Sequence, residues 1–382
     1  MHEPFRFDPV VMPDTEQALR AEVRAFLDDW APRWSAWDKG HSWTGHDRAF
    51  SRAVGERGWI GMSWPKAYGG GARSMLERYV VIEEMLAAGA PVGAHWVSDR
   101  QSGPLILRLG TEAQRQKYLP PIIRGESCFC IGLSEPDAGS DLASVRTRAE
   151  RRDGGWRITG RKIWTTNAHL SDYMIALVRT EGTVENRQKG LSQFIVPMDA
   201  PGLTVRQIAD MTGEAHFNEV TFDDVPLAED ALIGREGAGW EQATAELAFE
   251  RSGPDRFLST FPALALLVDA VRDQPDRLVA RGIGQAIAEL AVLRHMSVSL
   301  AGMLDQGLMP NNEAAVVKEL GVELEQRTPE LVRTLAGGFG GAAEGGLSDI
   351  QLAHLQLTPT FSLRGGTREI VRGIMARGLG LR

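Results

Sequence analysis

The sequence is short of cysteine and has no surplus of basic residues, and each shortage excludes a class of protein. With two cysteines in 382 residues, disulfides cannot form the framework of the fold. Lys and Arg number 42 against 50 Asp and Glu, so the formal net charge is -8. A chain without a basic surplus is not expected to bind nucleic acid. The eight histidines show no metal-ligand spacing, and no metal site is predicted.

Long apolar runs are missing as well. No stretch approaches the roughly 18 apolar residues of a membrane span. The first residues carry acids and prolines where a signal peptide has a basic and then an apolar run. Hydrophobic residues make up 43% and charged residues 24%, the balance of a folded globular protein. We therefore expect a cytoplasmic protein of two or three domains, without a membrane span.

The two cysteines lie close together. Cys128 and Cys130 fall in a strand-like run, where alternate side chains share one face. Because no Cys or His pair at ligand spacing occurs elsewhere, buried thiols are favoured over a metal pair.

The periodicity of apolar residues divides the chain into three. From Thr15 to about Ile122 the apolar residues recur at intervals of three and four, which predicts helices. One of these helices is expected to be capped by Thr111 and ended by Pro120 and Pro121. From about Glu126, short runs rich in β-branched and aromatic residues alternate with turn residues, which predicts at least five strands.

From residue 239 the helical period returns. The sequence thus predicts an α+β fold with an N-terminal helical domain (1–124), a middle antiparallel β domain (125–235) and a C-terminal helical bundle (236–382). With no helix between the strands, the middle domain fits a sandwich or a barrel.

Two segments of the middle domain have the composition of a ligand site. The loop LSEPDAGSD (133–141) brings small residues and hydroxyls together, although such residues also form ordinary turns. In GRKIWTTN (160–167), Trp164 and Thr166 are expected on the same side of a strand. An aromatic wall beside a hydroxyl suits a flat heterocycle, and a Trp in the β core is the structural alternative.

Several segments occur together in one order: SWPKAYGG, LGTEAQRQKYLPPI, LSEPDAGSD, ITGRKIWTTN, LSQFIVP, EVTFDDV and GGTREIVRGIMARGLG. With this set the chain resembles the acyl-CoA dehydrogenase family over about residues 15 to 382. The resemblance implies FAD as the cofactor, a C-terminal four-helix bundle, and assembly of subunits as a dimer or tetramer. It further implies an acyl-CoA substrate and an electron-transfer flavoprotein or similar acceptor, as in lipid catabolism.

By this resemblance, the middle domain contacts the flavin ring. The backbone at Leu133 and the hydroxyl of Ser134 are expected at its pyrimidine edge. Ser140 is expected where FAD and the pantetheine arm of the substrate pass. Trp164 is expected to flank the isoalloxazine, and Thr166 to hydrogen-bond flavin N5, the atom that receives hydride.

The resemblance assigns cofactor contacts to the C-terminal domain too. Thr367 and Glu369 fall where the family contacts FAD. Gly337 and Gly338 match a glycine pair that lies against the FAD of a neighbouring subunit.

The family's chemistry needs a carboxylate to remove the α-proton of a thioester. Many members carry it in a Glu-Gly-Thr near the C-terminus, where this chain has Gly365 after Arg364. Long-chain and isovaleryl-CoA dehydrogenases instead carry it on the first helix after the β domain, before an Arg. Glu250 precedes Arg251 at that place, so the resemblance implies that Glu250 is the base and that Arg251 and Gly365 face the substrate.

Helix geometry alone leaves two readings of Glu250 open. At about 100° per residue it lies near the apolar face of Trp240, Ala243 and Leu247, where partial desolvation strengthens a carboxylate as a base. It also continues the face of Glu246 at i+4, as a solvated residue would. In the family arrangement that the resemblance implies, the Gly365 N–H, together with a flavin ribityl hydroxyl, is expected to polarise the thioester carbonyl.

The chain departs from the family after Arg251. The Arg-x-x-Phe-Gly turn that holds the FAD of the adjacent subunit is not recognisable, and Pro254 is expected to break the helix near Gly253. A homologous partner chain that completes the flavin site is one explanation.

Asp99 and Arg100 fall where family members line the far end of the acyl pocket. There they indicate a branched, cyclic or polar acyl group, and a solvated helix end is the alternative.

The resemblance leaves three functions open. The first is FAD-dependent conversion of an acyl-CoA to a trans-2-enoyl-CoA. The second is a flavin-poor subunit that completes a partner's flavin site. The third is a flavin monooxygenase on the same fold, which needs no base for an α-proton and is disfavoured by Glu250.

Overall fold

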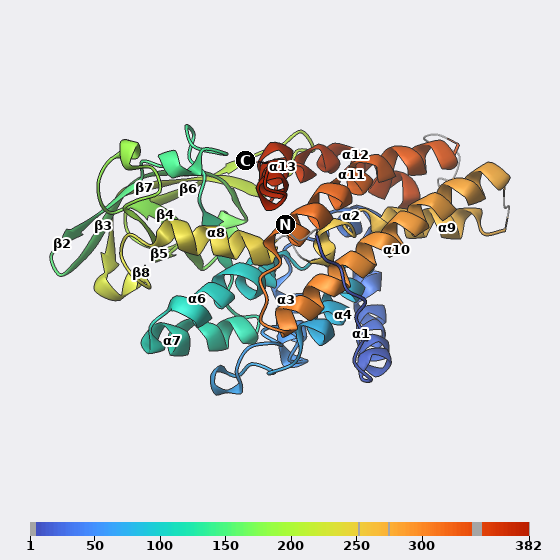
Figure 1. Cartoon of the computed structure of the whole chain (residues 1–382), viewed down its shortest axis with the longest axis horizontal. Coiled ribbons are helices and arrows are strands. Elements are labelled where there is room, and N and C mark those ends of the chain that lie inside the picture. Colours follow the sequence, from blue (N-terminus) through green and yellow to red (C-terminus); the bar gives the residue numbers. More distant parts are fainter. Residues whose placement is uncertain (1–4, 251–252, 274–275, 338–345, 382) are drawn as a thin grey trace. The chain divides into compact units, whose positions relative to one another are not determined.

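The computed structural model shows the chain as two units (Figure 1). It describes residues 5–250, 253–273, 276–337 and 346–381, except the side chains of 245–250. The first unit combines residues 1–45, 73–91 and 248–382, and the second combines 46–72 and 92–247. The helices expected as one N-terminal domain are thus shared between the two units. The helices Ala36–Gly40 and Met75–Ala87 pack on C-terminal helices, and Glu16–Trp30 packs on Met75–Ala87.

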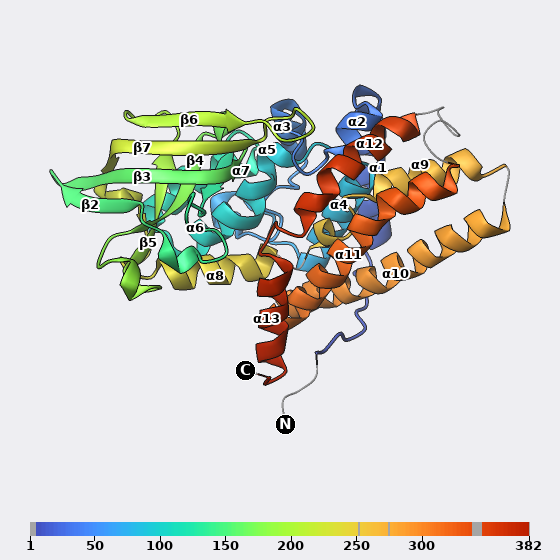
Figure 2. The same cartoon turned by 90° about the horizontal axis from the view of Figure 1, so that it is seen from above.

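The first unit is helical. Its long helices α10, α11 and α12 pack side by side, and α4 packs against both α1 and α10 (Figure 2). Leu264, Leu267, Val332 and Ile350 are at the centre of one core cluster of this unit. The α-helices of this unit are α1 (Glu16–Trp30), α2 (Ala36–Gly40), α4 (Met75–Ala87), α9 (Phe261–Val271), α10 (Arg277–Asp305), α11 (Asn311–Leu335), α12 (Leu347–Phe361) and α13 (Arg368–Gly378).

Helix α8 (Gly239–Glu250) ends where the sequence predicts a break. Gly253 has an extended backbone (φ -81°, ψ 166°), and a 3-10 turn, η8, follows at Pro254–Arg256. The steric clash between a proline ring and the preceding residue explains this conformation. The prediction for Pro254 is confirmed.

Helix α10 corrects the expectation that no segment has the length and composition of a membrane span. Within the described residues, this helix alone is long and apolar enough to cross a membrane. Core helices of globular proteins meet the same criteria, and α10 packs against α4 and α11 while its Arg294 pairs with Glu83. These contacts favour a core helix of the bundle.

The second unit begins with the helices α3 (Arg48–Glu56), α5 (Gly93–Val97), α6 (Gly103–Leu109) and α7 (Glu112–Ile123). Thr111 caps α7 as predicted, in a capping box with Gln114. The prediction that Pro120 and Pro121 end the helix is wrong, because both lie inside its last turn. Gly125, with φ +65°, follows the end of the helix instead.

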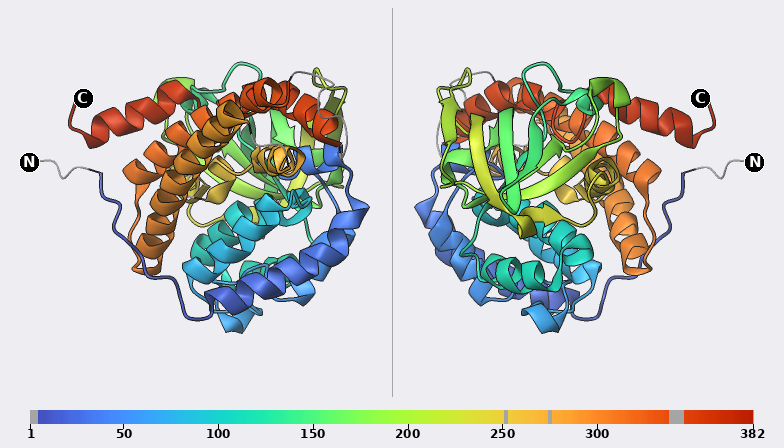
Figure 3. Two further views of the ribbon diagram at one scale, coloured as in Figure 1. Left: turned by 90° about the vertical axis from the view of Figure 1, so that its right-hand side faces the viewer. Right: turned by 90° about the vertical axis from the view of Figure 1, so that its left-hand side faces the viewer.

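Eight strands of the second unit form a single sheet, whose order is β6-β7-β3-β2-β4-β5-β8, with β1 paired to β4. The strands lie side by side in the right-hand view of Figure 3. The strands are β1 (Phe129–Gly132), β2 (Arg148–Arg152), β3 (Gly155–Thr166), β4 (Tyr173–Arg179), β5 (Leu191–Pro197), β6 (Leu203–Ile208), β7 (Phe217–Ala228) and β8 (Leu232–Ile233).

Most of the pairing is antiparallel, as predicted. A tight turn at Asp153 and Gly154, both with positive φ, joins β2 to β3. Strand β4 is the exception, since it pairs in parallel with β1 and, at one residue pair, with β2. The β2–β3 hairpin lies between β1 and β4 in the sequence, and this long connection lets β4 run in the same direction as β1.

The core of the sheet accounts for both cysteines. Cys130 is fully buried among Met174, Phe194 and other apolar side chains. Cys128, two residues earlier in the chain, is also buried. Burial raises the pKa of the Cys128 thiol to about 11 and that of Cys130 to about 12. The prediction of buried thiols is confirmed.

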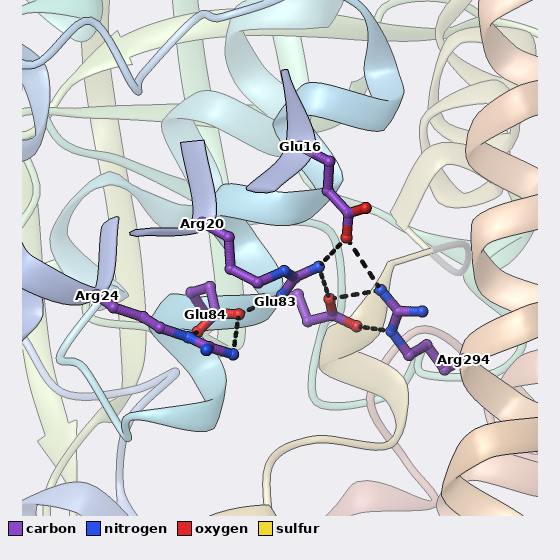
Figure 4. A network of polar contacts seen from close by, with 6 residues as sticks. All are labelled: Glu16, Arg20, Arg24, Glu83, Glu84 and Arg294. Atoms are coloured by element: carbon purple, nitrogen blue, oxygen red, sulfur yellow. Dashed lines mark hydrogen bonds and ion pairs between the residues drawn. The ribbon is translucent and has the colours of Figure 1, made fainter. Parts of the chain in front are cut away.

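A network of ion pairs joins three distant segments of the first unit (Figure 4). Arg20 of α1 pairs with Glu83 (2.9 Å) and Glu84 of α4, and Arg294 of α10 pairs with Glu83 at 2.6 Å. Arg24 adds a second contact to Glu84 at 2.8 Å. Both carboxylates are buried, so they depend on these cations for compensation.

Arg20 and Arg24 allow a matched test of this network. The Arg20 side chain is 12% exposed and that of Arg24 is 63% exposed. Arg20→Met is expected to lower the free energy of unfolding by about 3 kcal/mol, because it leaves buried carboxylates undercompensated. Arg24→Met, whose ion pair is screened by solvent, is expected to cost less than about 1 kcal/mol. Urea denaturation of both variants measures the difference; equal losses would contradict this account.

Candidate functional site

Trp164 lies on a bulge of β3. The pairing with β7 shifts between Lys162, opposite Val220, and Thr165, opposite Asn218. Two residues of β3 therefore face one of β7, the arrangement of a β-bulge. Trp164 has φ +60°, a conformation that bulky residues rarely adopt. Strain of this kind is found at functional sites.

The bulge places the Trp164 indole outward. The side chain is 56% exposed, and its ring packs edge-on against Phe217 with the centroids 5.8 Å apart. On β7, Phe217 is the register partner of the half-buried Thr166, and the Trp164 ring packs against Phe217, so Trp164 and Thr166 lie on the same side as predicted. The alternative in which Trp164 fills the β core is wrong.

The loop after β1 is bound to this bulge. The Ile163 N–H donates to the carbonyl oxygen of Ser134 at 3.0 Å, and Ser134 and Leu133 are half-buried. Ser140 lies further along the same loop and is exposed. The structure thus brings Leu133 and Ser134 together with the strand of Trp164 and Thr166.

A buried ion pair beneath this loop was missed by the sequence analysis. The Lys162 Nζ donates to Glu135 Oε1 at 2.8 Å and to the Leu133 carbonyl oxygen at 3.0 Å. Burial lowers the pKa of Lys162 to about 8, against the opposing effect of Glu135. Burial tends to raise the pKa of Glu135, but Lys162 and two backbone N–H donors outweigh it and lower that pKa. The signal in the sequence is a lysine within a strand that is otherwise partly apolar.

In the first unit, the turn that holds Gly365 is anchored by Arg364. The Arg364 Nη2 donates to Glu325 Oε2 (2.5 Å), to Ser259 Oγ (3.0 Å) and to the carbonyl oxygen of Asp255 (3.0 Å). Burial raises the pKa of Glu325 and lowers that of Arg364, and their pairing opposes both shifts. Arg364 therefore ties the turn to the segment that follows α8.

Gly365 and Gly366 both have positive φ, at 68° and 96°. The Lys318 ammonium donates to the Gly366 carbonyl oxygen, which fixes the turn from a second side. A residue with a side chain at either position would be strained. The turn is therefore built for glycine.

Thr367 and Glu369 begin α13. Thr367 is the N-cap, and its hydroxyl accepts from the Ile370 N–H at 3.5 Å. Hydrogen bonds from its own backbone N–H and from Thr367 lower the pKa of the exposed Glu369. Gly337 is exposed, with φ +76°, directly after the end of α11, the usual place of a helix-terminating glycine.

Asp99 and Arg100 lie in a π-helical turn, η3 (Ser98–Ser102). Both side chains are buried; Asp99 accepts from the Gly61 N–H at 2.8 Å, and the Arg100 guanidinium lies 4.6 Å from the Trp96 ring centroid. The alternative of a solvated helix end is wrong. Single π-helical turns recur at functional sites.

Three predicted residues lie beyond what the structure describes. Arg251 and Gly338 are outside the described residues, and Glu250 is described only as the last residue of α8, without its side chain.

The described residues fit a bound flavin. An exposed indole on a strained bulge, a half-buried hydroxyl beside it and a loop of small residues are suited to one face and one edge of a flat heterocycle. Three family models match the chain: the acyl-CoA dehydrogenase N-terminal domain over residues 13–126, the middle domain over 130–225 and the C-terminal domain over 262–380. The chain belongs to the acyl-CoA dehydrogenase family.

Relatives of similar length support the assignment. The chain is 35% identical to acyl-CoA dehydrogenase IpdE1 of Mycobacterium tuberculosis, covering 97% of this chain and 98% of IpdE1. It is similar to the solved structure of the Tcur3481-Tcur3483 steroid ACAD (TM-score 0.85, 29% identity, 97% and 98% covered). It is also similar to the ChsE4-ChsE5 complex from M. tuberculosis (TM-score 0.84, 27% identity, 98% and 100% covered). The protein is thus an acyl-CoA dehydrogenase, a flavoprotein that uses FAD.

A substitution at Trp164 is expected to affect FAD affinity and not the free energy of unfolding. Trp164→Gly removes a backbone strain of about 1–2 kcal/mol along with the contact to Phe217, so the free energy of unfolding is expected to change little. FAD affinity is expected to fall by about tenfold, because the aromatic wall is lost. Trp164→Phe, which keeps a ring, serves as the control. Urea denaturation and FAD titration measure the two quantities; an unchanged FAD affinity in Trp164→Gly would exclude this role.

Proposed function

We propose that this acyl-CoA dehydrogenase converts an acyl-CoA thioester to its trans-2-enoyl-CoA with Glu250 as the base. The observation that carries the proposal is the turn at Gly365 and Gly366, which has no carboxylate and whose positive φ values disfavour one. Glu250 at the end of α8 is then the carboxylate that matches the family's other arrangement.

The proposed mechanism divides the work among this chain's residues. Glu250 takes the α-proton, and the Gly365 N–H polarises the thioester carbonyl so that the α-carbon becomes acidic. Arg364 orients both segments, because it anchors the Gly365 turn to Asp255 and Ser259, a few residues beyond Glu250. FAD, when bound, accepts the β-hydride at N5, which Thr166 is proposed to hydrogen-bond.

We propose that the acyl group is bulky or polar rather than a plain alkyl chain. Asp99 and Arg100 support this, because they are buried in η3, which the family resemblance places at the far end of the acyl pocket, and polar side chains there suit a polar or ring-bearing acyl group. A steroid-derived acyl group is one candidate, since a similar solved structure is a steroid ACAD.

We propose that this chain works with a second chain, either a copy or a homologue. Two similar structures are of paired proteins, Tcur3481-Tcur3483 and ChsE4-ChsE5. On this chain, α13 and the residues after it expose Ile370, Leu379 and Leu381, an apolar set that a partner could cover. A partner could also supply the contacts to the FAD diphosphate for which this chain lacks the Arg-x-x-Phe-Gly turn. An electron-transfer flavoprotein is the proposed acceptor of the electrons.

Glu250→Gln tests the base. The variant is expected to keep its flavin but to lose at least about a thousandfold in the rate of flavin reduction by substrate, because an amide cannot take the proton. The rate is measured by anaerobic stopped-flow absorbance at the flavin band. Glu246→Gln, one helical turn earlier on α8, is the matched control and is expected to keep the wild-type rate. A Glu250→Gln variant that reduces its flavin normally would remove Glu250 from the mechanism.

The visible spectrum of the purified protein separates the proposed functions. Bleaching of the flavin by one member of a panel of straight, branched and steroid-like acyl-CoA thioesters is the expected result, and it identifies the acyl class. A colourless protein that binds a homologous chain would instead favour a subunit that completes a partner's site. Flavin that turns over with NAD(P)H and oxygen, but not with a thioester, would favour a monooxygenase.

A further inference from the structure

Lys162 is a charged side chain buried completely within the second unit. Its stem passes Gly132 at the end of β1, where a Cβ would lie 3.3 Å from Lys162 Cγ and 2.5 Å from the sulfur of Met174. The absence of a side chain at Gly132 lets the ammonium group reach the loop at Leu133 and Glu135. Burying a lysine is costly unless it is paired and hydrogen-bonded, and here both conditions are met.

The Glu135 carboxylate gathers three segments around this ammonium. It accepts from the N–H groups of Arg146 (2.7 Å) and Thr147 (3.0 Å) in addition to Lys162. The Thr147 hydroxyl accepts in turn from the Arg161 N–H at 3.1 Å, and this hydrogen bond links the segment before β2 to β3. The loop after β1, the segment before β2 and the start of the β3 bulge are therefore held by one pair of charges.

The pair acts on both sides of the strained residue. Before Trp164, Lys162 and Ile163 are bound to the loop through the carbonyl oxygens of Leu133 and Ser134. After Trp164, the Thr165 carbonyl oxygen accepts from the buried Asn218 side chain at 2.9 Å. A non-glycine residue persists at positive φ only where its surroundings determine the backbone in this way.

The contact to Leu133 also has an electrostatic consequence. The Leu133 carbonyl and the Ser134 N–H belong to one peptide group, so an ammonium bound to the oxygen makes the N–H a stronger donor. Within the described part of the chain, this N–H has no hydrogen-bond acceptor. It is therefore suited to donate to an electron-rich carbonyl oxygen of a ligand.

We propose that Lys162 is a positioning residue for the flavin: it fixes the Trp164 bulge against the Leu133–Ser134 loop and polarises the peptide that meets the pyrimidine edge. The inference rests on the proposed placement of the flavin at these segments. Electron density on the pyrimidine carbonyls rises when a flavin is reduced, so a strengthened donor there favours the reduced state. Lys162 thereby raises the reduction potential of the bound FAD.

The test compares Lys162→Met, the paired variant K162M/E135Q and the control Lys189→Met, which removes an exposed lysine of the same unit. For each protein we measure urea unfolding, FAD affinity and the midpoint potential of the bound flavin. Each protein is studied as it is purified, with any chain that co-purifies left in place. Lys162→Met is expected to be less stable, because Glu135 is left buried without its cation. K162M/E135Q removes both charges and is expected to recover much of this stability.

FAD binding and potential distinguish positioning from a purely structural role. In K162M/E135Q the potential is expected to stay more negative than in the wild type and the FAD affinity about tenfold lower, since the charge-assisted hydrogen bond is absent. Lys189→Met should match the wild type in all three quantities.

A paired variant with wild-type affinity and potential would overturn the inference alone. The paired variant also keeps the test valid if Lys162→Met does not fold. Wild-type protein that binds no FAD would overturn the proposed function, and this inference with it.

Discussion

Two charges are buried beneath the loop that follows the first strand of the sheet, and the geometry around Trp164 depends on them. An isolated ammonium in the core of a sheet would be prohibitively costly, so Lys162 is stable there only while Glu135 and the Leu133 carbonyl are in place. The dependence is mutual, because Glu135 needs the cation as well as its two backbone donors. The result is a rigid connection between a loop and a strand bulge that have no regular ladder to align them.

The helical unit uses the same principle at another strained turn. Arg364 forms a buried ion pair with Glu325. Arg364 directly precedes Gly365 and Gly366, two consecutive residues with positive φ. In both units a buried charge pair thus lies beside backbone that regular hydrogen bonding does not hold. Ion pairs of this kind contribute little net stability, because desolvation offsets their attraction, but they restrict the backbone to one arrangement. Precise positioning of ligand groups requires that restriction.

Local rules predicted the features that depend on neighbours in the sequence. The cap at Thr111, the break before Pro254 and the shared side of Trp164 and Thr166 all follow from residues within a few positions. Local rules did not predict the bulge at Trp164, because the pairing of β3 with β7 determines it.

Long-range pairing also explains what the sequence could not reveal. Lys162 and Glu135 are separated along the chain, and each alone is typical of an exposed strand or a turn. Likewise, an apolar helix face does not specify its partner, so the packing of α2 and α4 with C-terminal helices was not predicted. The role of Glu250 came from a family resemblance alone, and its side chain lies outside what the structure describes.

The helical unit is assembled from three separate stretches of chain, 1–45, 73–91 and 248–382. Such non-local contacts slow folding, because long loops must close before they form. During synthesis on the ribosome, α1 and α4 emerge well before α10. Glu83 of α4 therefore cannot pair with Arg294 until the strands have been synthesised. The sheet-containing unit has all of its chain available once residue 247 is synthesised. The order of synthesis therefore favours folding of the sheet-containing unit before that of the helical unit.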